Sequence, residues 1–215
     1  MNQSERRIMM LCEQHDIISR GHFKIKGFHS DIFIDLERAL SLAPVRDEFC
    51  EAITQNCLDR STDNSGRHDT SIDIVIGIGR RGLTIADAVA NQLRALTHRQ
   101  VISLEAIKED GMVALPISGR RLIRGRNVLT VMDIVRTGST AAKAADLITS
   151  NGGNNCGLSA FFRRGELADY DGHGRRPFVI CNPSFELWTT ACPKCQQGIP
   201  LDPIPRSREQ LALEF

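Results

Sequence analysis

The sequence predicts an α/β fold in which helices flank a mostly parallel central sheet. Strand-like apolar runs alternate with helical patterns from about residue 71 to residue 182, and the run "IDIVIGIG" at 72–79 is almost continuously apolar, as in strands buried on both faces. Tight turns follow two of these strands, "GIGRRG" at 77–82 and "DIVRTGST" at 133–140. Parallel sheets bind ligands beyond the carboxyl ends of their strands, so both turns are candidate binding loops.

The individual elements follow from periodicity. The chain begins with a helix, continues through "GHFKIKGFHSDIFIDLERAL" at 21–40, and reaches a second helix at 45–58. The predicted strands and helices of the core then follow, with strands at 72–79, 101–107, 127–133, 156–162 and 177–182 and helices at 83–96 and 140–153. In the helix at 83–96, the spacing of Ile85, Val89, Leu93 and Leu96 places them on one face. We expect one domain over 1–215, with a core at about 60–182 and a small cap, or hood, formed by about 1–40 and 183–215.

Composition and charge limit the function classes. An apolar fraction of 41% and a net charge of +1 are typical of an ordinary globular protein and give no sign of binding to nucleic acid or an anionic membrane. The N-terminal apolar run is too short for a signal peptide, and no segment approaches the roughly 20 apolar residues of a membrane span. These features favour a cytoplasmic protein.

The seven cysteines are an odd number, and five of them lie in apolar patterns: Cys12, Cys50, Cys57, Cys156 and Cys181. This usage predicts reduced, buried thiols. The remaining two, Cys192 and Cys195, form the pair "CPKC". Because there is no second pair and no histidine at metal spacing, we expect a structural or incidental role for them and no protein-ligated metal.

The stretch "NVLTVMDIVRTGST" at 127–140 carries the strongest functional signal. A strand, a turn of small hydroxyl residues and glycine, and a helix together direct backbone N–H groups towards one point, which is how phosphate is bound. Asp133 at the rim could accept hydrogen bonds from sugar hydroxyls. The alternative is an ordinary strand–turn–helix junction in which a serine or threonine caps the helix, and the stretch alone does not separate the two.

This stretch resembles the signature of the type I phosphoribosyltransferases, which has four apolar residues, two acidic ones, two apolar ones and a Thr-Thr-Gly-type turn. Four further segments resemble orotate phosphoribosyltransferases in the same order, namely "GHFKIKGFHSDIFIDLERAL", "VIGIGRRGLTIADAVANQL", "LEAIKEDG" and "SAFFRRGE", and the tail "CPKCQQGIPL" is similar to one found in some members. The ordered set covers most of the chain. It implies a type I phosphoribosyltransferase-like fold.

The resemblance also implies ligand contacts. The ribose hydroxyls and 5′-phosphate of phosphoribosyl pyrophosphate (PRPP) would lie against Asp133, Ile134, Val135, Arg136, Thr137, Gly138, Ser139 and Thr140. Pyrophosphate with Mg²⁺, itself held mainly by the substrate phosphates, would lie against Gly79, Arg80, Arg81 and Gly82. Guanidinium groups suit this role because they offer forked donors to phosphate, although a solvated turn is the alternative for both arginines.

Catalysis and base recognition are assigned in the same way. The resemblance implies that Lys108 and Asp133 are catalytic, and that Lys108 stands at the base of a mobile loop at 109–124 that closes over the neighbouring subunit's site in a homodimer. Arg164 matches the arginine that meets the orotate carboxylate, and Lys26 and Phe33 match the base-side wall. For Phe33, core packing is the alternative.

The implied reaction is a step of pyrimidine biosynthesis. Orotate displaces pyrophosphate from C1 of PRPP, through an oxocarbenium-like transition state, to give orotidine 5′-monophosphate. Three departures stand out: Met132 replaces the first acid of the signature, Arg136 replaces a threonine, and "KIKGFHS" lacks the serine before Gly27. Two alternatives therefore remain: a phosphoribosyltransferase for a different base, and a non-catalytic relative that binds PRPP or a nucleotide.

Overall fold

The computed structural model describes residues 3–25, 27–60, 71–164, 177–183, 187–188 and 190–204. It divides into two compact units. We call Met1–Val45 with Pro183–Phe215 the terminal unit, and Arg46–Asn182 the core unit. Among the described helices, none has the length and apolarity that crossing a bilayer requires.

The core unit has a six-stranded sheet with the strand order β5-β4-β3-β6-β7-β8. Its elements, together with the helix α3 that leads into it, are α3 (Ala43–Arg60), β3 (Ile74–Ile78), α4 (Gly79–Thr97), β4 (Ile102–Glu109), β5 (Met112–Ala114), α5 (Ile117–Leu122), β6 (Asn127–Val135), α6 (Ser139–Ser150), β7 (Asn154–Arg163) and β8 (Phe178–Cys181). Every neighbouring pair is parallel except β4 with β5. The predicted mostly parallel sheet is therefore confirmed.

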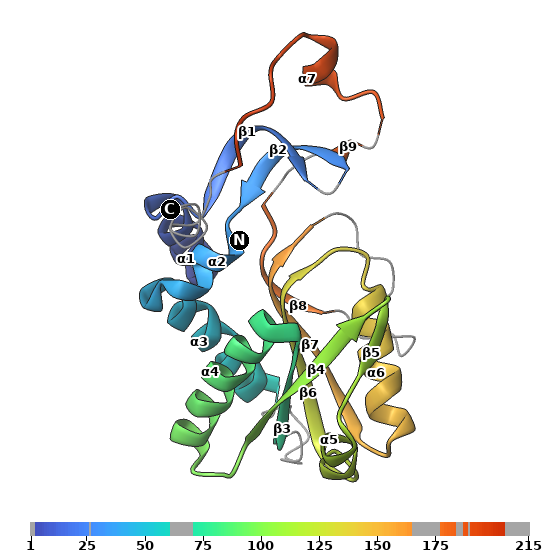
Figure 1. Ribbon diagram of the computed structural model, residues 1–215. Coiled ribbons are helices and arrows are strands. Elements are labelled where there is room, and N and C mark those ends of the chain that lie inside the picture. Colours follow the sequence, from blue (N-terminus) through green and yellow to red (C-terminus); the bar gives the residue numbers. More distant parts are fainter. Residues whose placement is uncertain are drawn as a thin grey trace, which may run out of the picture. The chain divides into compact units, whose positions relative to one another are not determined.

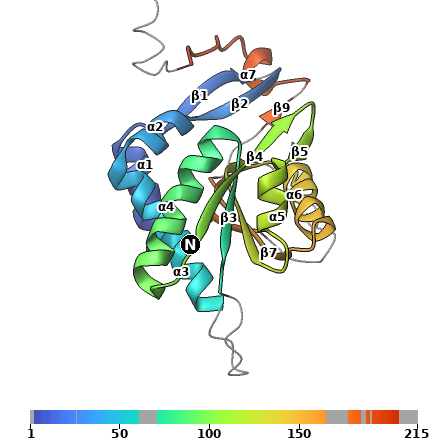
Figure 2. The same ribbon diagram turned by 60° about the horizontal axis from the view of Figure 1, so that its bottom comes forward.

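The order of the strands creates a switch point. After β3 the chain crosses to β4 on one side, and it later returns to place β6 on the other side of β3. Helix α4 packs on one face of the sheet and α6 on the opposite face (Figure 1, Figure 2). Where neighbouring connections lie on opposite faces, a crevice opens at the carboxyl ends of the strands. Both turns highlighted by the sequence follow these two strands, β3 and β6.

Apolar packing fixes the two helices. One cluster joins the sheet to α6, and it contains Ile74, Ile76, Ala106, Val113, Leu115, Ile123, Val128, Ala144 and Ile148. On α4, Ile85, Val89 and Leu93 are buried as their spacing predicts. Leu96, which the spacing places on the same face, is 62% exposed. Leu96 lies in the last turn of α4, beside the exposed segment 98–100.

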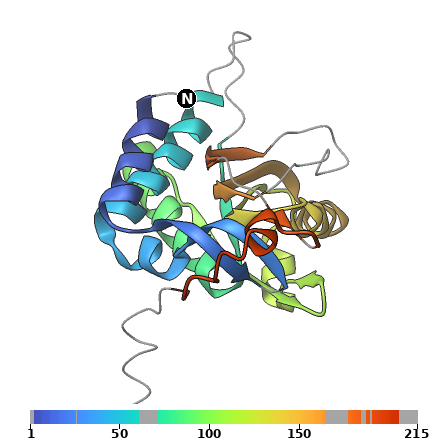
Figure 3. The same ribbon diagram turned by 90° about the horizontal axis from the view of Figure 1, so that it is seen from above.

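The terminal unit is built from both ends of the described chain. Its elements are α1 (Gln3–Gln14), β1 (Ile18–Ile25), β2 (Phe28–Ile34), α2 (Leu36–Ser41), β9 (Leu187–Trp188) and α7 (Pro193–Gln196). Its sheet has the order β1-β2-β9 and is antiparallel. Seen from above, α7 and the following tail lie beside the β1–β2 hairpin (Figure 3). Segments more than 150 residues apart in sequence therefore meet within this unit.

None of the seven cysteines is in a disulfide, which confirms the expected reduced thiols. Four of the five in apolar patterns are buried, whereas Cys156 is only half-buried. Burial raises the pKa of Cys12 to about 12, with a smaller contribution from Glu13, and it raises the pKa of Cys50 to about 12, with a smaller contribution from Asp47.

These thiols should resist alkylation in the folded protein. With a pKa of about 12, a thiol is only about 0.01% thiolate at pH 8, and the thiolate is the nucleophile. We expect iodoacetamide at pH 8 to modify Cys156 but not Cys12 or Cys50, as measured by peptide mass spectrometry. Unfolding in urea should expose all of them. Rapid labelling of Cys12 in the folded chain would contradict this packing.

Candidate active site

The loop after β6 has the geometry of an anion-binding turn. Strand β6 ends at Val135, and α6 begins at Ser139 after Gly138, whose φ of 80° is left-handed and favours glycine. The N-cap is Gly138 itself, with no side-chain capping bond. The alternative in which a serine or threonine occupies the N-cap position is therefore wrong. The hydrogen-bond donors at the start of α6 are therefore its backbone N–H groups and the hydroxyls of Thr137, Ser139 and Thr140.

Hydrogen bonds order this loop. Thr137 Oγ1 donates to Ser139 Oγ at 3.3 Å and accepts from the Ser139 N–H at 3.4 Å. The Ile134 N–H donates to Asp133 Oδ1 at 2.7 Å, and the carbonyl of Val135 accepts from the Arg164 N–H at 2.8 Å. The side chain of Val135 is buried, so this residue shapes the site through its backbone, whereas Ile134 is half-buried.

Met132 and Asp133 face opposite sides of the sheet, as consecutive strand residues do. Met132 packs against an apolar cluster that includes Ala141, Leu158 and Ala160. Asp133 lies on the α4 side, where its carboxylate meets an arginine. The methionine at the position of the missing acid therefore contributes to packing under α6.

The turn "GIGRRG" is built by a close approach of two glycines. Gly79 has a φ of 68°, and α4 begins there, four residues earlier than the sequence predicts. A Cβ on Gly77 would lie 2.1 Å from the carbonyl carbon of Gly82, and one on Gly82 would lie 2.9 Å from that of Gly77. Only glycine at both positions lets the helix begin this close to the strand, which explains the early start. Arg80 and Arg81 are exposed in the first turn.

An ion pair joins the two turns. Arg81 Nε donates to Asp133 Oδ2 at 2.6 Å across 52 residues of sequence. The Arg81 side chain is 44% exposed, whereas that of Asp133 is 14% exposed. An accessible guanidinium and a carboxylate thus share the carboxyl ends of β3 and β6, at the switch point of the sheet.

Lys108 contacts the loop after β6 from strand β4. It lies near the end of β4, and its Nζ donates to Thr140 Oγ1 at 2.9 Å. An ammonium group therefore adjoins the N-terminus of α6, where both the helix dipole and the lysine favour an anion. The sequence selects Lys108 from one segment and Asp133 to Thr140 from another, and the structure brings Lys108 and Thr140 together.

Arg164 follows β7 at the same end of the sheet and is half-buried. Burial, and then repulsion from the charge of Arg136, lowers its pKa from the ordinary value. Of the two residues expected beside the base, Phe33 lies in β2 of the terminal unit, where its ring lies 5.8 Å from that of Phe23. Aromatic packing is thus the contact observed for Phe33. Lys26 lies outside the described residues.

The segment 109–124 differs from the single loop that the sequence suggests. It contains β5 and α5, and Asp110 and Gly111 at the β4–β5 turn both have positive φ. Val113, Leu115 and Ile123 are buried in the core and anchor it. The short apolar run "VAL" at 113–115, with its β-branched first residue, was the signal for a strand here. In contrast, the side chains of Met112 and Ile117 are 64% and 70% exposed.

A known protein family matches most of the core unit. The model of the phosphoribosyl transferase domain matches residues 51–174, more than half of the chain. The chain belongs to this family. As a phosphoribosyltransferase family member, it has the type I fold that the sequence resemblance implies, and its structural neighbours share that fold.

Its relatives include several orotate phosphoribosyltransferases. The one from Caldanaerobacter subterraneus subsp. tengcongensis is 25% identical over 197 residues, covering 91% of this chain and 94% of the relative. An adenine phosphoribosyltransferase of Mycobacterium avium is 30% identical over 118 residues, covering 47% of this chain and 62% of the relative. Among solved structures, the orotate phosphoribosyltransferase of Mycobacterium tuberculosis H37Rv with Fe(III) dicitrate has a TM-score of 0.60 at 16% identity, covering 83% of this chain and 96% of that one. A second structure of the same protein contains PRPP, with a TM-score of 0.55 at 15% identity, and covers 85% of this chain and 90% of that one.

Two histidines were not identified from the sequence as candidate metal ligands. In the terminal unit, His22 and His29 lie beside Cys192 and Cys195, and their ligand-type atoms all lie within 4.8 Å of one another. No histidine lies at metal spacing from the CPKC pair in the sequence, but the fold places two histidines beside it. The expectation that the pair lacks histidine partners is therefore wrong. The signal that could have found them is the pair of histidines, seven positions apart, that brackets the six residues "FKIKGF".

Proposed function

We propose that this phosphoribosyltransferase transfers the phosphoribosyl group of PRPP to orotate, giving orotidine 5′-monophosphate and pyrophosphate. The observation that carries the proposal is the Arg81–Asp133 ion pair at 2.6 Å, because it links the two turns that the family resemblance assigns to pyrophosphate and ribose. Relatives named orotate phosphoribosyltransferase that align over most of the chain support the choice of base.

The 5′-phosphate of PRPP would bind at the N-terminus of α6. Backbone N–H groups at 137–140 and the hydroxyls of Thr137, Ser139 and Thr140 supply donors there. Lys108, whose Nζ is 2.9 Å from Thr140 Oγ1, adds a positive charge beside them. Arg136 is exposed at the rim of the same loop and adds a second one.

When PRPP binds, contacts with the substrate would replace the ion pair between Arg81 and Asp133. Asp133 would accept hydrogen bonds from the ribose hydroxyls, and Arg81, with Arg80, would turn to the pyrophosphate. As the bond between C1 and pyrophosphate breaks, negative charge grows on the leaving group and positive charge on the ribose ring. Arginines and backbone N–H groups placed beforehand stabilise that leaving group, and Asp133 favours the cationic ring.

The side chains around the loop after β6 are compatible with an Mg²⁺ ion that is held chiefly by the phosphates of the substrate. Among the described residues, grouped metal-ligand side chains do not occur around the β6 loop, and Asp133 is the carboxylate of that loop. Magnesium in phosphoryl-containing sites commonly uses one or two carboxylates together with phosphate oxygens and water. When bound, Mg²⁺ would neutralise charge on the departing pyrophosphate.

Arg164 is the proposed partner of the orotate carboxylate. Its backbone is fixed to Val135 at the end of β6, and its half-buried guanidinium is well suited to a bidentate carboxylate contact. The wall that Lys26 and Phe33 would form beside the base stays a prediction from the family resemblance.

We also propose a homodimer whose segment 109–124 contributes to the neighbouring subunit's site. The exposed apolar side chains of Met112 and Ile117 on this segment support an interface there. Sedimentation equilibrium should give about twice the monomer mass, and a monomer at assay concentrations would contradict this part of the proposal.

The chain incubated with PRPP, Mg²⁺ and orotate should consume orotate, followed by its ultraviolet absorbance. Parallel reactions with adenine and uracil test the alternative of a different base, which the adenine phosphoribosyltransferase relative favours. Turnover with one of these but not orotate would select that alternative. Thermal stabilisation by PRPP without turnover of any base would favour the non-catalytic relative, for which Met132 is the supporting feature.

A further inference from the structure

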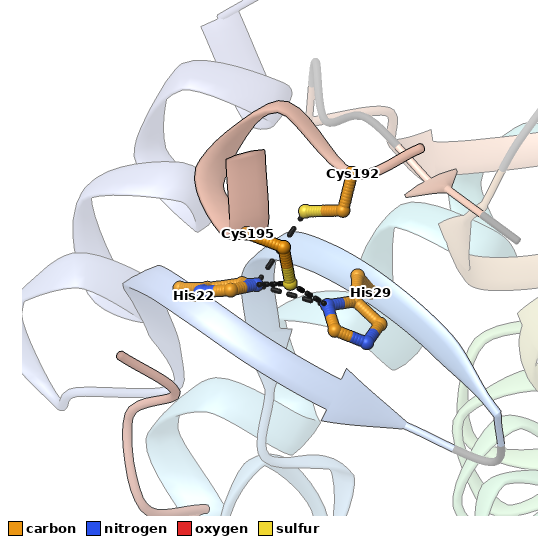
Figure 4. A group of neighbouring side chains, drawn as sticks. All are labelled: His22, His29, Cys192 and Cys195. Atoms are coloured by element: carbon orange, nitrogen blue, oxygen red, sulfur yellow. Dashed lines mark hydrogen bonds between the residues drawn. The ribbon is translucent and has the colours of Figure 1, made fainter. Parts of the chain in front are cut away.

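Four side chains of the kinds that bind metals meet in the terminal unit, and none of them belongs to the loops after β3 and β6. His22 lies in β1 and His29 in β2, whereas Cys192 precedes α7 and Cys195 lies within it. Figure 4 shows the two imidazoles and the two thiols directed at one point. The set is the one place in the described residues where ligand-type side chains gather in this way.

The distances suit a tetrahedral zinc ion. Cys192 Sγ lies 3.4 Å from His22 Nε2, and Cys195 Sγ lies 3.6 Å from His22 Nε2 and 3.3 Å from His29 Nδ1. Zn–S bonds of about 2.3 Å and Zn–N bonds of about 2.0–2.1 Å at tetrahedral angles separate sulfur from nitrogen by about 3.6 Å and two nitrogens by about 3.4 Å. The two nitrogens are 2.9 Å apart, so they need to separate by only about 0.5 Å.

The tautomer of His22 is set for metal binding. Its Nδ1 lies 2.9 Å from the carbonyl oxygen of Ile199 and 3.2 Å from that of Pro200. Because carbonyl oxygens only accept, Nδ1 must carry the proton and donate. The lone pair of Nε2 then points into the cluster. A ligating histidine whose other nitrogen donates to a backbone carbonyl is the usual arrangement around metals.

Backbone hydrogen bonds hold the C-terminal tail against the strand that carries His22. The pairing of β1 with β2 is irregular between Arg20 and Phe23, where His22 lies. Asp202 of the tail makes two hydrogen bonds to the backbone of His22. Its Oδ2 accepts from the His22 N–H at 2.7 Å, and its own N–H donates to the His22 carbonyl at 2.7 Å. Gly21 permits this approach, because a Cβ there would lie 2.3 Å from Asp202 Oδ2.

We propose that His22 Nε2, His29 Nδ1, Cys192 Sγ and Cys195 Sγ form a structural zinc site that fastens the C-terminal tail to the β1–β2 hairpin. Thiolate and imidazole ligands together select zinc over magnesium or calcium, which take oxygen ligands. Four protein ligands close the coordination sphere, which is the pattern of structural sites, whereas catalytic sites keep a position open. Cys195 is exposed and gives the ion a path of entry, and His22 and Cys192 are buried.

The test measures metal directly in the full-length chain. Protein purified under reducing conditions from zinc-supplemented medium should contain about one zinc ion per chain by inductively coupled plasma mass spectrometry. After removal of zinc by a chelator, addition of Co²⁺ should produce visible d–d bands and a thiolate-to-cobalt charge-transfer band. Chelation should also lower Tm, and adding back Zn²⁺ should restore it.

Variants separate this site from adventitious binding. Cys195→Ser and His29→Asn remove single ligands and should each lower the zinc content at least about tenfold after dialysis, in line with the effect of disturbing a site's ligands. The controls are Cys156→Ser, which changes a half-buried thiol of the core unit, and His98→Asn, which keeps a residue tolerant of the left-handed φ of 54°. Both controls should retain zinc and the cobalt spectrum.

Several results would overturn the proposal. Reduced wild-type protein that neither carries zinc nor gives a thiolate–cobalt band would do so, as would ligand variants that retain the metal. A Cys192–Cys195 disulfide that persists during zinc-supplemented, reducing purification would also contradict it. Circular dichroism of each variant distinguishes loss of a ligand from loss of fold. The readouts are independent of phosphoribosyl transfer, so failure of one proposal leaves the other intact.

Discussion

The Asp133→Asn variant is expected to lower kcat/KM for PRPP by about 10- to 100-fold. Losing a charge-assisted hydrogen bond costs about 1.5–3 kcal/mol, and each 1.4 kcal/mol is a factor of ten in rate. Asparagine keeps the shape of the side chain but removes the charge that meets Arg81 and that would favour the cationic ribose. Steady-state kinetics with PRPP as the varied substrate and orotate saturating measure the effect.

The matched control is Asp146→Asn, an exposed carboxylate on α6 that is not part of the 133–140 loop. It should leave kcat/KM within about twofold, since exposed charges away from a site contribute little. If Asp133→Asn behaves like this control, Asp133 does not contact the substrate. Unchanged circular dichroism of both variants is needed to assign the loss to chemistry.

The Met132→Asp variant is expected to lower the free energy of unfolding by about 1–3 kcal/mol. The change removes a side chain that packs on Ala141, Leu158 and Ala160 and introduces a charge beside them. Urea denaturation followed by circular dichroism measures the loss. In the folded fraction, activity should hold or rise, because the change restores the acid that the family signature carries at this position.

Met132→Leu serves as the control, since it keeps the volume and apolarity and should cost less than about 1.5 kcal/mol. Wild-type stability of Met132→Asp would contradict the packing of Met132 under α6. A collapse of activity in folded Met132→Asp would show instead that the site is adapted to methionine.

The sequence was sufficient for the core strands because burial on both faces leaves an unmistakable apolar pattern. The runs at 72–79 and 127–133 became β3 and β6, with β6 extending two residues further to Val135. The start of α4 was missed because its first turn contains Gly79 and Gly82, residues of low helix propensity. The close approach of Gly82 to Gly77 of the strand outweighs that propensity, and a contact of this kind is visible only in three dimensions.

The candidate site was predictable as a set of motifs but not as a geometry. Lys108, Arg81 and Asp133 were each selected from a separate segment. The contacts among Arg81, Asp133, Lys108 and Thr140 depend on the strand order, which periodicity does not reveal. The role of Met132 likewise follows from the side of the sheet on which it lies.

The cysteine and histidine cluster was the least predictable feature. Its ligands come from two ends of the chain, with His22 and Cys192 separated by 170 positions. Metal spacing rules rely on ligands close together in sequence, and here each half contributes only two. The hairpin and the tail supply the complete set only after folding.

Calorimetric titration of the full-length chain with PRPP in the presence of Mg²⁺ tests the central claim most directly. The claim is that the loop after β6, together with Arg81, forms the PRPP site. It predicts saturable binding at about one site per chain, weakened about tenfold or more by Asp133→Asn and unchanged by Asp146→Asn. Absence of PRPP binding, or binding that Asp133→Asn leaves unaltered, would contradict it.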